Sequence, residues 1–355
     1  MSKLNVALIF GGKSGEHDVS LVSASSIYKH IDTNKYNVFT IGVTKEGRWL
    51  YYEGNEENIK NGEWVNLANK NVEINLVPNG NKEVGILFED GRVEKLDVLF
   101  PVLHGPYGED GIVQGLFEIS QIPYVGCRVL ASSVGMDKLI CKKVFSQIGL
   151  PQVDYTYTNR WRFNNDSIGE LNNIESKLDY PIFVKPANLG SSVGISKVSN
   201  REELIKGIEE ALKYDSRIVL EQGIEAREIE VAVLGNDEVQ ESIAGEIKPA
   251  KDFYDYEDKY INGASTYDIP ADISQDDMED IRKMAVEAFK GIDGKGLSRV
   301  DFFIDKNSGE KYINEINTLP GFTNISMYPK MWEATGIEYS ELIDKLIELA
   351  LQTKK

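Results

Sequence analysis

Short, continuously apolar stretches alternate with helix-patterned stretches over the first third of the chain. The apolar runs at residues 4–10, 36–43 and 96–103 predict strands, and the stretches at 19–31 and 112–122 predict helices. A strand that is apolar along its whole length is typical of a parallel sheet with both faces covered by helices. The sequence therefore predicts an N-terminal α/β domain with a parallel sheet.

The rest of the chain predicts two further units that mix helices and strands. The length of 355 residues suggests two or three domains, and we expect three, at residues 1–125, 126–220 and 221–355. Ser274 is a predicted N-cap for the helix that follows it. Helices are expected at 136–148, 201–214 and 274–290, and strands at 153–158, 182–186 and 194–198, with strands at 217–221 and 228–234 opening the third unit.

Composition excludes several classes of function. The formal net charge of −18 argues against nucleic acid or an anionic membrane as the main partner, because either would need a basic face. Cys127 and Cys141 are too few for a disulfide framework or a cysteine zinc site, so we expect a reduced, cytoplasmic setting. No apolar stretch approaches the length of a membrane span, and the run at 4–10 is better interpreted as a buried strand than as a signal peptide.

The segment KPANLGSSVG, residues 185–194, has the composition of a phosphate-binding loop. Lys185 follows an apolar run, and two glycines flank Ser191 and Ser192, which together offer a cation, hydroxyl groups and backbone N–H groups. The lysine precedes the glycines, so this is not the Walker pattern. An ordinary Gly-Ser turn is the alternative.

The segment LSRVDFFIDKNSGEKYINEIN, residues 297–317, predicts a β-hairpin. Two apolar runs flank a five-residue loop at 306–310. If Asp305 lies opposite Lys311, position 303 lies opposite 313, 301 opposite 315 and 299 opposite 317. Strand alternation then puts four polar side chains on one face, namely Arg299, Asp301, Glu315 and Asn317.

This predicted face is a candidate metal site. The adjacent carboxylates of Asp301 and Glu315 repel one another unless a cation lies between them. Oxygen ligands without histidine or cysteine favour Mg²⁺ or Mn²⁺, and Mg²⁺ typically joins protein carboxylates to substrate phosphates. The alternative is a solvated strand face on which Arg299 pairs with Asp301.

Several motifs together resemble those of one enzyme family. FGGKSGEHDVSLVSA, PVLHGPYGEDGIVQGLFE, GMDKLICKKVF, FYDYEDKY and NEINTLPGFTNISMYP occur in the order typical of the D-alanine–D-alanine ligases, members of the ATP-grasp superfamily. Only residues 53–95 and 159–178 lack a recognisable motif. The resemblance implies a three-domain ATP-grasp architecture in which two α+β units close on ATP.

The resemblance also implies how the chain binds ATP and two Mg²⁺ or Mn²⁺ ions. The central domain would supply the phosphate loop, and the C-terminal domain the metal ligands and a lid at 251–266. Lys138 and Lys185 would hold the α- and β-phosphates, and Lys259 in the lid would reach the γ-phosphate. The other implied cofactor residues are Ser192, Glu221 at the adenine amino group and Glu228 at the ribose, with Asp301, Glu315 and Asn317 as metal ligands.

Further positions match residues that bind substrate in the family. Glu16 would anchor the ammonium group of the first D-alanine, and His104 would support it, although a lone histidine at a strand end is often structural. Arg299 and the Gly321 N–H would stabilise the oxyanion, and Tyr260 would hydrogen-bond Ser191 and through it reach Glu16. The remaining implied substrate residues are Tyr254 in the lid, and Ser326 and Met327 at the second D-alanine.

The activity implied is ATP-dependent ligation of two D-alanines to D-alanyl-D-alanine through a D-alanyl phosphate, for peptidoglycan precursor synthesis. The alternatives are a D-alanine–D-serine or D-alanine–D-lactate ligase of the same family, and a regulatory module that binds ATP without turnover. The resemblance also implies a homodimer. The base that deprotonates the second amine is left unassigned.

Overall fold

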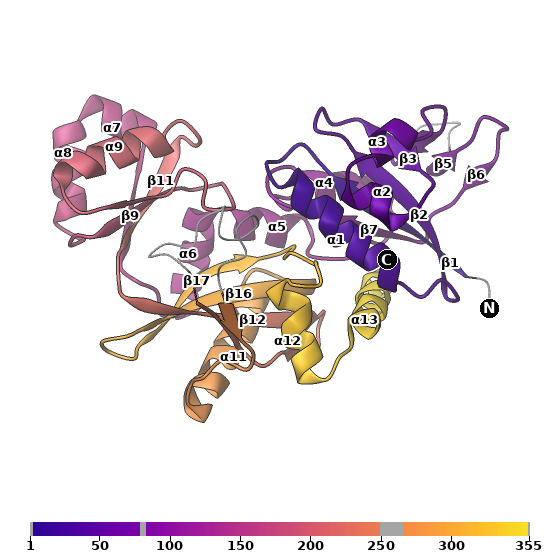
Figure 1. Cartoon of the computed structure of the whole chain (residues 1–355). Coiled ribbons are helices and arrows are strands. Elements are labelled where there is room, and N and C mark those ends of the chain that lie inside the picture. Colours follow the sequence, from indigo (N-terminus) through magenta and orange to yellow (C-terminus); the bar gives the residue numbers. More distant parts are fainter. Residues whose placement is uncertain (1–2, 79–82, 249–265, 354–355) are drawn as a thin grey trace.

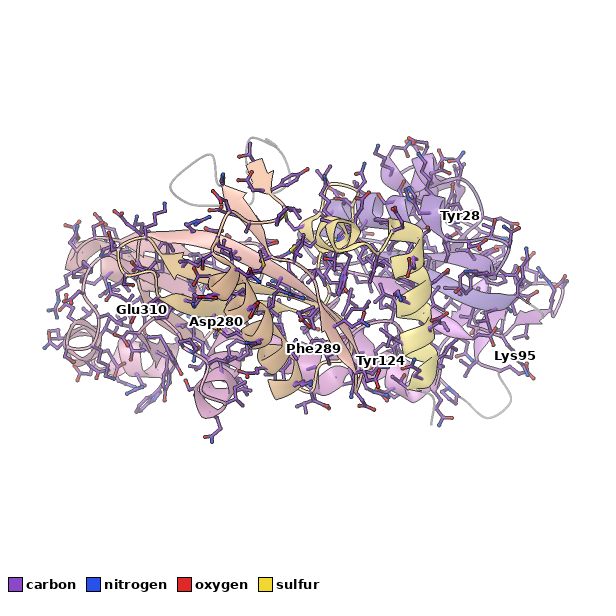
Figure 2. All side chains as sticks on the ribbon, turned by 90° about the horizontal axis from the view of Figure 1, so that it is seen from below. Tyr28, Lys95, Tyr124, Asp280, Phe289 and Glu310 are labelled. Atoms are coloured by element: carbon purple, nitrogen blue, oxygen red, sulfur yellow. The ribbon has the colours of Figure 1, made fainter. Side chains whose placement is uncertain are left out.

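The computed structural model describes residues 3–78, 83–248 and 266–353. Figure 1 shows three sheet-containing parts: the N-terminal part on one side, β9 and β11 with α7, α8 and α9 on the other, and β12, β16 and β17 between and below them. In Figure 2 the molecule is elongated, with Glu310 near one end and Lys95 near the other. Within the described ranges, no helix has the length and apolar character required to cross a bilayer.

The N-terminal part contains the predicted parallel sheet. The strand order is β3-β2-β1-β7, in which β1 pairs in parallel with both β2 and β7, while β3 is an antiparallel edge. The side chains from Val6 to Phe10 in β1 are fully buried, which explains why the sequence is apolar throughout this strand. The elements are β1 (Leu4–Gly11), α1 (His17–His30), β2 (Tyr36–Val43), β3 (Trp49–Tyr52), α2 (Glu56–Lys60), α3 (Trp64–Leu67), β7 (Val98–Val102) and α4 (Ile112–Ser120), with a small sheet of β4 (Glu73–Asn75), β5 (Gly85–Leu87) and β6 (Val93–Glu94).

The central sheet has the strand order β10-β9-β11-β8. The strand at 217–221 was predicted to open the third unit, and this prediction was wrong. In the structure this strand is β11 and pairs antiparallel with both β9 and β8, a long-range pairing that its apolar pattern alone does not specify. The elements are β8 (Tyr155–Asn159), α7 (Arg160–Asn165), α8 (Ser167–Glu175), β9 (Ile182–Pro186), β10 (Ser196–Val198), α9 (Arg201–Ala211) and β11 (Arg217–Gln222).

The third sheet has the order β15-β14-β12-β16-β17, with β13 paired to β12. The predicted cap of the long helix is confirmed, because the Ser274 side chain accepts a hydrogen bond from the Asp277 N–H. The elements are β12 (Ala226–Gly235), β13 (Val239–Glu241), β14 (Gly245–Lys248), β15 (Thr266–Asp268), α11 (Gln275–Gly291), β16 (Gly296–Asp305), β17 (Lys311–Asn317), α12 (Met327–Thr335) and α13 (Tyr339–Gln352).

The helix predicted at 136–148 is present as α6 (Lys138–Gln147). A further helix that was not predicted, α5 (Val129–Met136), precedes it and is separated from it at Asp137. Asp137 has an extended backbone, and its side chain accepts a hydrogen bond from the Ile140 N–H, so it caps α6. Ala131 of α5 and Phe145 of α6 share one hydrophobic cluster with β12 and β16, so both helices cover the third sheet.

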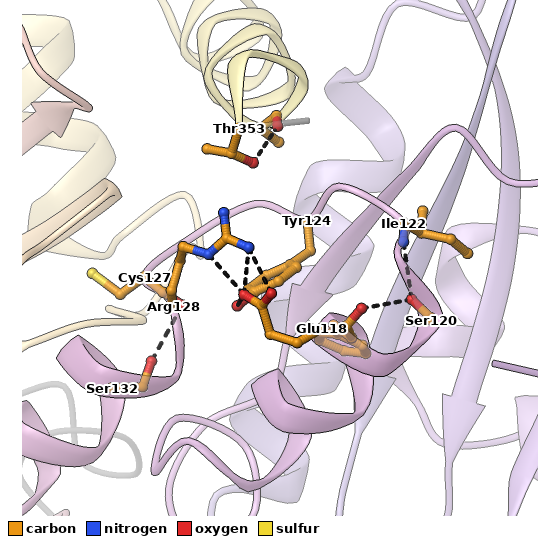
Figure 3. Close-up of polar contacts among 10 residues, drawn as sticks. Glu118, Ser120, Ile122, Tyr124, Cys127, Arg128, Ser132 and Thr353 are labelled. Carbon is orange, nitrogen blue, oxygen red and sulfur yellow. Dashed lines mark hydrogen bonds and ion pairs between the residues drawn. The ribbon is translucent and has the colours of Figure 1, made fainter. Parts of the chain in front are cut away.

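Contacts outside the sheets join the N-terminal part to the rest of the chain. Leu342, Ile343 and Leu346 of α13 lie in the same hydrophobic cluster as β1, so the C-terminal helix packs on the N-terminal part. Arg128, just before α5, donates hydrogen bonds of 2.7 and 2.6 Å to the Glu118 carboxylate of α4 (Figure 3). The domain limits stay a prediction, although the three sheets divide the chain near them.

Candidate active site

A cavity of about 1270 Å³ is lined by residues from all three parts. Asp301 is not among its lining residues. Tyr254, Lys259 and Tyr260 lie outside the described residues. The other predicted site residues all line the cavity: Glu16, His104, Lys138, Lys185, Ser191, Ser192, Glu221, Glu228, Arg299, Glu315, Asn317, Gly321, Ser326 and Met327.

The loop after β9 has the backbone of an anion-binding loop. Ser191 and Ser192 have φ values of 52° and 58°, in the left-handed region that serine seldom adopts, and Gly194 follows with 72°. The Ser191 hydroxyl oxygen is buried, and the described residues provide no hydrogen-bond partner for it. Strained backbone and a buried hydroxyl without a protein partner are both typical of a loop that binds a ligand.

Lys185 and Glu221 belong to a buried triad with Lys142. The two lysine Nζ atoms lie 2.5 and 2.8 Å from the two oxygens of Glu221. Burial opposes ionisation of Glu221, but the two lysines outweigh it and lower its pKa to about 2. Burial likewise acts to lower the pKa of Lys185, but the Glu221 carboxylate raises it overall.

Sequence reasoning missed Lys142, although a signal for it was present. Lys142 lies four residues after Lys138, and positions i and i+4 share one face of a helix. In α6 these two lysines project toward the cavity region, one onto Glu221 and the other onto the phosphate loop.

Lys138 connects the phosphate loop with the predicted metal-binding face. It is the first residue of α6, and its Nζ donates a 2.7 Å hydrogen bond to the Leu189 carbonyl oxygen. The same nitrogen lies 3.6 Å from Glu315 Oε2. A phosphate group bound beside the loop would therefore contact the Lys138 ammonium group, which is already oriented by the Leu189 carbonyl oxygen and by Glu315.

The β16–β17 hairpin forms with the predicted pairing at its functional end. Arg299 lies opposite Asn317, and Asp301 lies opposite Glu315, as the sequence predicted. Toward the turn the prediction was wrong, because Phe303 pairs with Tyr312 and Ile304 with Lys311. A β-bulge after Asp301 shifts the register by one residue between the two ends. Bulges next to active sites commonly redirect side chains, and this one brings Glu315 beside Asp301.

A third carboxylate extends this row across the sheet. Glu230 of β12 lies opposite Asp301, which in turn lies opposite Glu315. Arg299 donates two hydrogen bonds of 2.7 Å to Asp301, and its Nε lies 3.1 Å from Glu230 Oε2. The Arg299–Asp301 pair of the alternative considered above is therefore present, but the two side chains are largely buried and do not form a solvated strand face. Glu230 was missed because the β12–β16 pairing is long-range.

The donor set on this face suits a hard divalent cation. Asp301 and Glu315 offer carboxylate oxygens, and the Asn317 amide nitrogen donates 2.9 Å to Asp301, which leaves its amide oxygen available. In the part of the chain that the structure describes, no group of three or more His, Cys, Asp or Glu residues forms a metal site. Because Arg299 engages both oxygens of Asp301, metal binding there requires this pair to loosen.

Glu16 lies beneath the phosphate loop, as the family resemblance implies. It is 8% exposed and immediately precedes α1. A Cβ atom added at Gly105 would lie 2.5 Å from Glu16 Oε2, and one added at Gly190 would lie 3.5 Å from it. The glycines at these two positions therefore let a carboxylate of the N-terminal part approach the loop of the central part.

His104 hydrogen-bonds other groups than Glu16. Its Nδ1 lies 3.0 Å from the Leu319 carbonyl oxygen and its Nε2 3.3 Å from the Ser23 hydroxyl, which accepts from the Phe322 N–H. Burial lowers the pKa of His104 below its ordinary value, against the opposing influence of Glu16, which favours the neutral imidazole at neutral pH. We interpret His104 as positioning the segment that carries Gly321; its role toward substrate stays a prediction.

The predicted second-substrate residues lie together beside this segment. The Ser326 hydroxyl accepts a 3.0 Å hydrogen bond from the Thr323 N–H, and a Cβ added at Gly321 would lie 3.1 Å from it. Met327 is 8% exposed, and its methyl group packs closely on Gly245 of β14. This side of the cavity therefore has a hydroxyl group beside an apolar wall.

The fold and this site define an ATP-grasp enzyme, and comparison with known proteins narrows the class. The model of the D-ala D-ala ligase N-terminus matches residues 5–127, and that of the D-ala D-ala ligase C-terminus matches residues 144–348. The chain belongs to the D-alanine–D-alanine ligase family.

Relatives match along nearly the whole chain. The D-alanine–D-alanine ligases of Ruminiclostridium cellulolyticum and Acetivibrio thermocellus are 54% and 50% identical to it, each over 99% of this chain and 96% of the relative. Among solved structures, the VanG D-Ala:D-Ser ligase of Enterococcus faecalis is 38% identical, with a TM-score of 0.87 over 98% of this chain and 100% of that one. The D-alanine–D-alanine ligase of Coxiella burnetii is 35% identical, with a TM-score of 0.85 over 100% and 95%.

Proposed function

We propose that the chain joins two D-alanines to D-alanyl-D-alanine through a D-alanyl phosphate and converts ATP to ADP and phosphate as it does so. The product would be a peptidoglycan precursor. The observation that carries this proposal is the cavity in which Lys138, Lys185 and the Ser191 loop meet Glu16 and Arg299. Curated relatives about 50% identical over the whole chain are D-alanine–D-alanine ligases.

In the first step, the carboxylate of one D-alanine attacks the γ-phosphorus of ATP, and ADP leaves. Lys138 and Lys185 hold the α- and β-phosphates by charge-assisted hydrogen bonds, and Ser192 contributes from the loop. Glu221 and Glu228 position the adenine and the ribose. Glu16 binds the ammonium group of the D-alanine, so that its carboxylate is held in line with the phosphoryl group.

Two Mg²⁺ or Mn²⁺ ions held by Asp301, Glu315 and Asn317 would neutralise charge on the transferred phosphoryl group. Metal binding at Asp301 would loosen the Arg299–Asp301 pair and let Arg299 turn toward the substrate, while Glu230, which lies 3.1 Å from Arg299 Nε, would still hold it from the other side.

In the second step, the amine of the second D-alanine attacks the acyl phosphate and phosphate leaves. Arg299 and the Gly321 N–H stabilise the oxyanion that develops on the carbonyl. Ser326 binds the carboxylate of the second D-alanine, and Met327 limits the space for its side chain.

The lid at 251–266 would exclude water from the acyl phosphate. Lys259 would reach the γ-phosphate, Tyr254 would contribute to substrate binding, and Tyr260 would hydrogen-bond Ser191; these three residues lie outside the described ranges. The buried Ser191 hydroxyl, which has no hydrogen-bond partner among the described residues, supports such a contact. We further propose a cytoplasmic homodimer with the three domains delimited above.

The test is phosphate release from ATP and Mg²⁺ with and without D-alanine. The proposal predicts release that depends on D-alanine and matches dipeptide formation. Release that ignores D-alanine would favour another ATP-dependent reaction, and none in either case would favour a regulatory module. The VanG structure makes D-alanine–D-serine ligation the second candidate, which a product analysis decides.

A further inference from the structure

Glu109 lines the cavity and has no role in the mechanism given so far. It lies in the loop between β7 and α4, and its Oε1 accepts a 2.8 Å hydrogen bond from the Gly105 N–H. The loop is fixed in turn, because the Gln114 side chain donates 2.9 Å to the Gly108 carbonyl oxygen. One carboxylate oxygen of Glu109 is therefore anchored to the backbone, while the described residues supply no hydrogen-bond partner to the other.

The surroundings of Glu109 place it toward the reacting groups. Its charge interacts with Glu16 on the side of the first D-alanine, and with Glu315 and Arg299 of the hairpin. His104 belongs to the same loop and is neutral. Burial first, and then repulsion by Glu16, raise the pKa of Glu109 to about 8, against the opposing effect of the Gly105 N–H. The carboxylate form of Glu109 is therefore a stronger base than an ordinary glutamate, and the fraction in that form grows as pH rises through about 8.

Three other titratable groups around the cavity, Glu221, Asp301 and His104, are held by protein partners. Glu221 is held by two lysines, and its pKa of about 2 makes it a weak base. Both oxygens of Asp301 accept hydrogen bonds from Arg299. The ring nitrogens of His104 lie within hydrogen-bond distance of a backbone carbonyl and a serine hydroxyl.

Three further carboxylates around the cavity have other roles or other partners. Glu16 is assigned to the first ammonium group, and Glu315 lies 3.6 Å from Lys138 on the predicted metal-binding face. Glu246 is held by Arg227 through hydrogen bonds of 2.8 and 2.7 Å. Glu109 thus has one carboxylate oxygen anchored by the Gly105 N–H, and among the described residues no donor reaches the other.

We propose that Glu109 accepts the proton that the ammonium group of the second D-alanine must lose before it can attack. The inference rests on the proposed function. The ammonium transfers one proton to the Glu109 carboxylate, and the resulting amine forms a C–N bond at the acyl carbon. The bond between the acyl carbon and the phosphate oxygen then breaks, and the departing phosphate takes the second proton from nitrogen. Glu109 releases its proton to solvent after the product leaves.

The test separates the two half-reactions in a Glu109→Gln variant. Glutamine can still accept the hydrogen bond from the Gly105 N–H but cannot take a proton. Dipeptide formation should fall by roughly 10²–10⁴-fold, the usual contribution of a positioned general base. Scrambling of oxygen between the bridging and non-bridging positions of the ATP β-phosphate, in the presence of D-alanine, should persist at the parental rate, because it needs only phosphorylation of the first D-alanine.

Hydroxylamine provides a second readout. It is uncharged at neutral pH, so it can capture the acyl phosphate without a base. Glu109→Gln should therefore form D-alanyl hydroxamate at close to the parental rate. The control is Asp110→Asn in the same loop, whose carboxylate accepts from the Tyr107 and Ile112 N–H groups and does not line the cavity. That change should affect dipeptide and hydroxamate formation equally.

The outcomes are distinguishable. If the parent makes no dipeptide, the proposed function fails. If the parent makes dipeptide and Glu109→Gln makes it nearly as fast, the proton-acceptor role is wrong. If the variant loses oxygen scrambling and hydroxamate together with dipeptide, Glu109 serves the first half-reaction or the fold, and the inference is also wrong.

Discussion

The two ends of the cavity differ in charge: basic side chains outnumber acidic ones at one end, and acidic side chains outnumber basic ones at the other. At one end, Lys142 and Lys185 contact one carboxylate, Glu221, and all three side chains are buried. At the reaction end, Glu230, Asp301 and Glu315 form a row across β12, β16 and β17, with Arg299 between the first two.

This difference indicates what each end can bind. At the first end two lysines contact a single glutamate, which leaves a net positive charge of one, and this charge suits the phosphates of ATP. The second has more carboxylates than cations, which suits a divalent metal ion and the ammonium groups of amino acids. The opposite charges of the two ends therefore favour binding of the ATP phosphates at one end of the cavity and of the amino-acid ammonium groups at the other.

The largest effect is expected from removing charge at the reaction end. Asp301→Asn or Glu315→Gln should leave the fold intact and lower kcat by about 10²–10³-fold or more, because a neutral amide cannot balance a divalent cation. Steady-state kinetics over a Mg²⁺ titration measures this. Asp305→Asn, at the solvent-exposed end of the same strand, is the control and should retain parental rates. Near-parental turnover of either variant at low Mg²⁺ would refute the metal assignment.

At the other end, the largest effect should be on stability. Glu221→Gln leaves two buried lysines without their counter-ion and should lower the free energy of unfolding by about 3–5 kcal/mol. Urea denaturation at neutral pH measures it, and ATP should restore part of the loss. Glu202→Gln, on an exposed helix, is the control, with little expected change. A Glu221→Gln protein as stable as the parent would mean that the triad is not an energetic unit.

The same triad predicts a pH dependence. The folded-state pKa of Glu221, about 2, lies below its ordinary value. Its contribution to stability is therefore fully present above the ordinary glutamate pKa and is lost as pH falls toward 2. Stability of the parent should fall more steeply than that of Glu221→Gln in this acid range. Parallel curves for the two proteins would contradict the lowered pKa.

A smaller effect is expected from Glu230→Gln. Arg299 keeps its two hydrogen bonds to Asp301 but loses its second carboxylate, so turnover should fall by about tenfold, corresponding to ~1.4 kcal/mol for an interaction of a charged group. The Mg²⁺ concentration for half-maximal rate should rise, because Arg299 then depends more on Asp301. An unchanged Mg²⁺ dependence would show that Glu230 does not hold Arg299 during catalysis.

The sequence predicted what depends on local pattern and missed what depends on distant pairing. The largely buried strands of the N-terminal sheet and the cap at Ser274 follow from short stretches of sequence, and both were predicted. The pairing of Asp301 with Glu315 was also predicted, although the pairing toward the turn was wrong because the bulge that links the two registers has no local signature. Glu230 reaches the site only through the pairing of β12 with β16.

Competition among second substrates tests the central claim most directly. The enzyme would receive ATP, Mg²⁺ and D-alanine, D-serine and D-lactate at equal concentrations, with products separated by mass. Met327 gives the second site an apolar wall, and such a wall rejects an added hydroxyl only about a hundredfold. We therefore predict D-alanyl-D-alanine as the main product, a trace of D-alanyl-D-serine and no D-alanyl-D-lactate near neutral pH. An excess of the D-serine or D-lactate product would contradict the account.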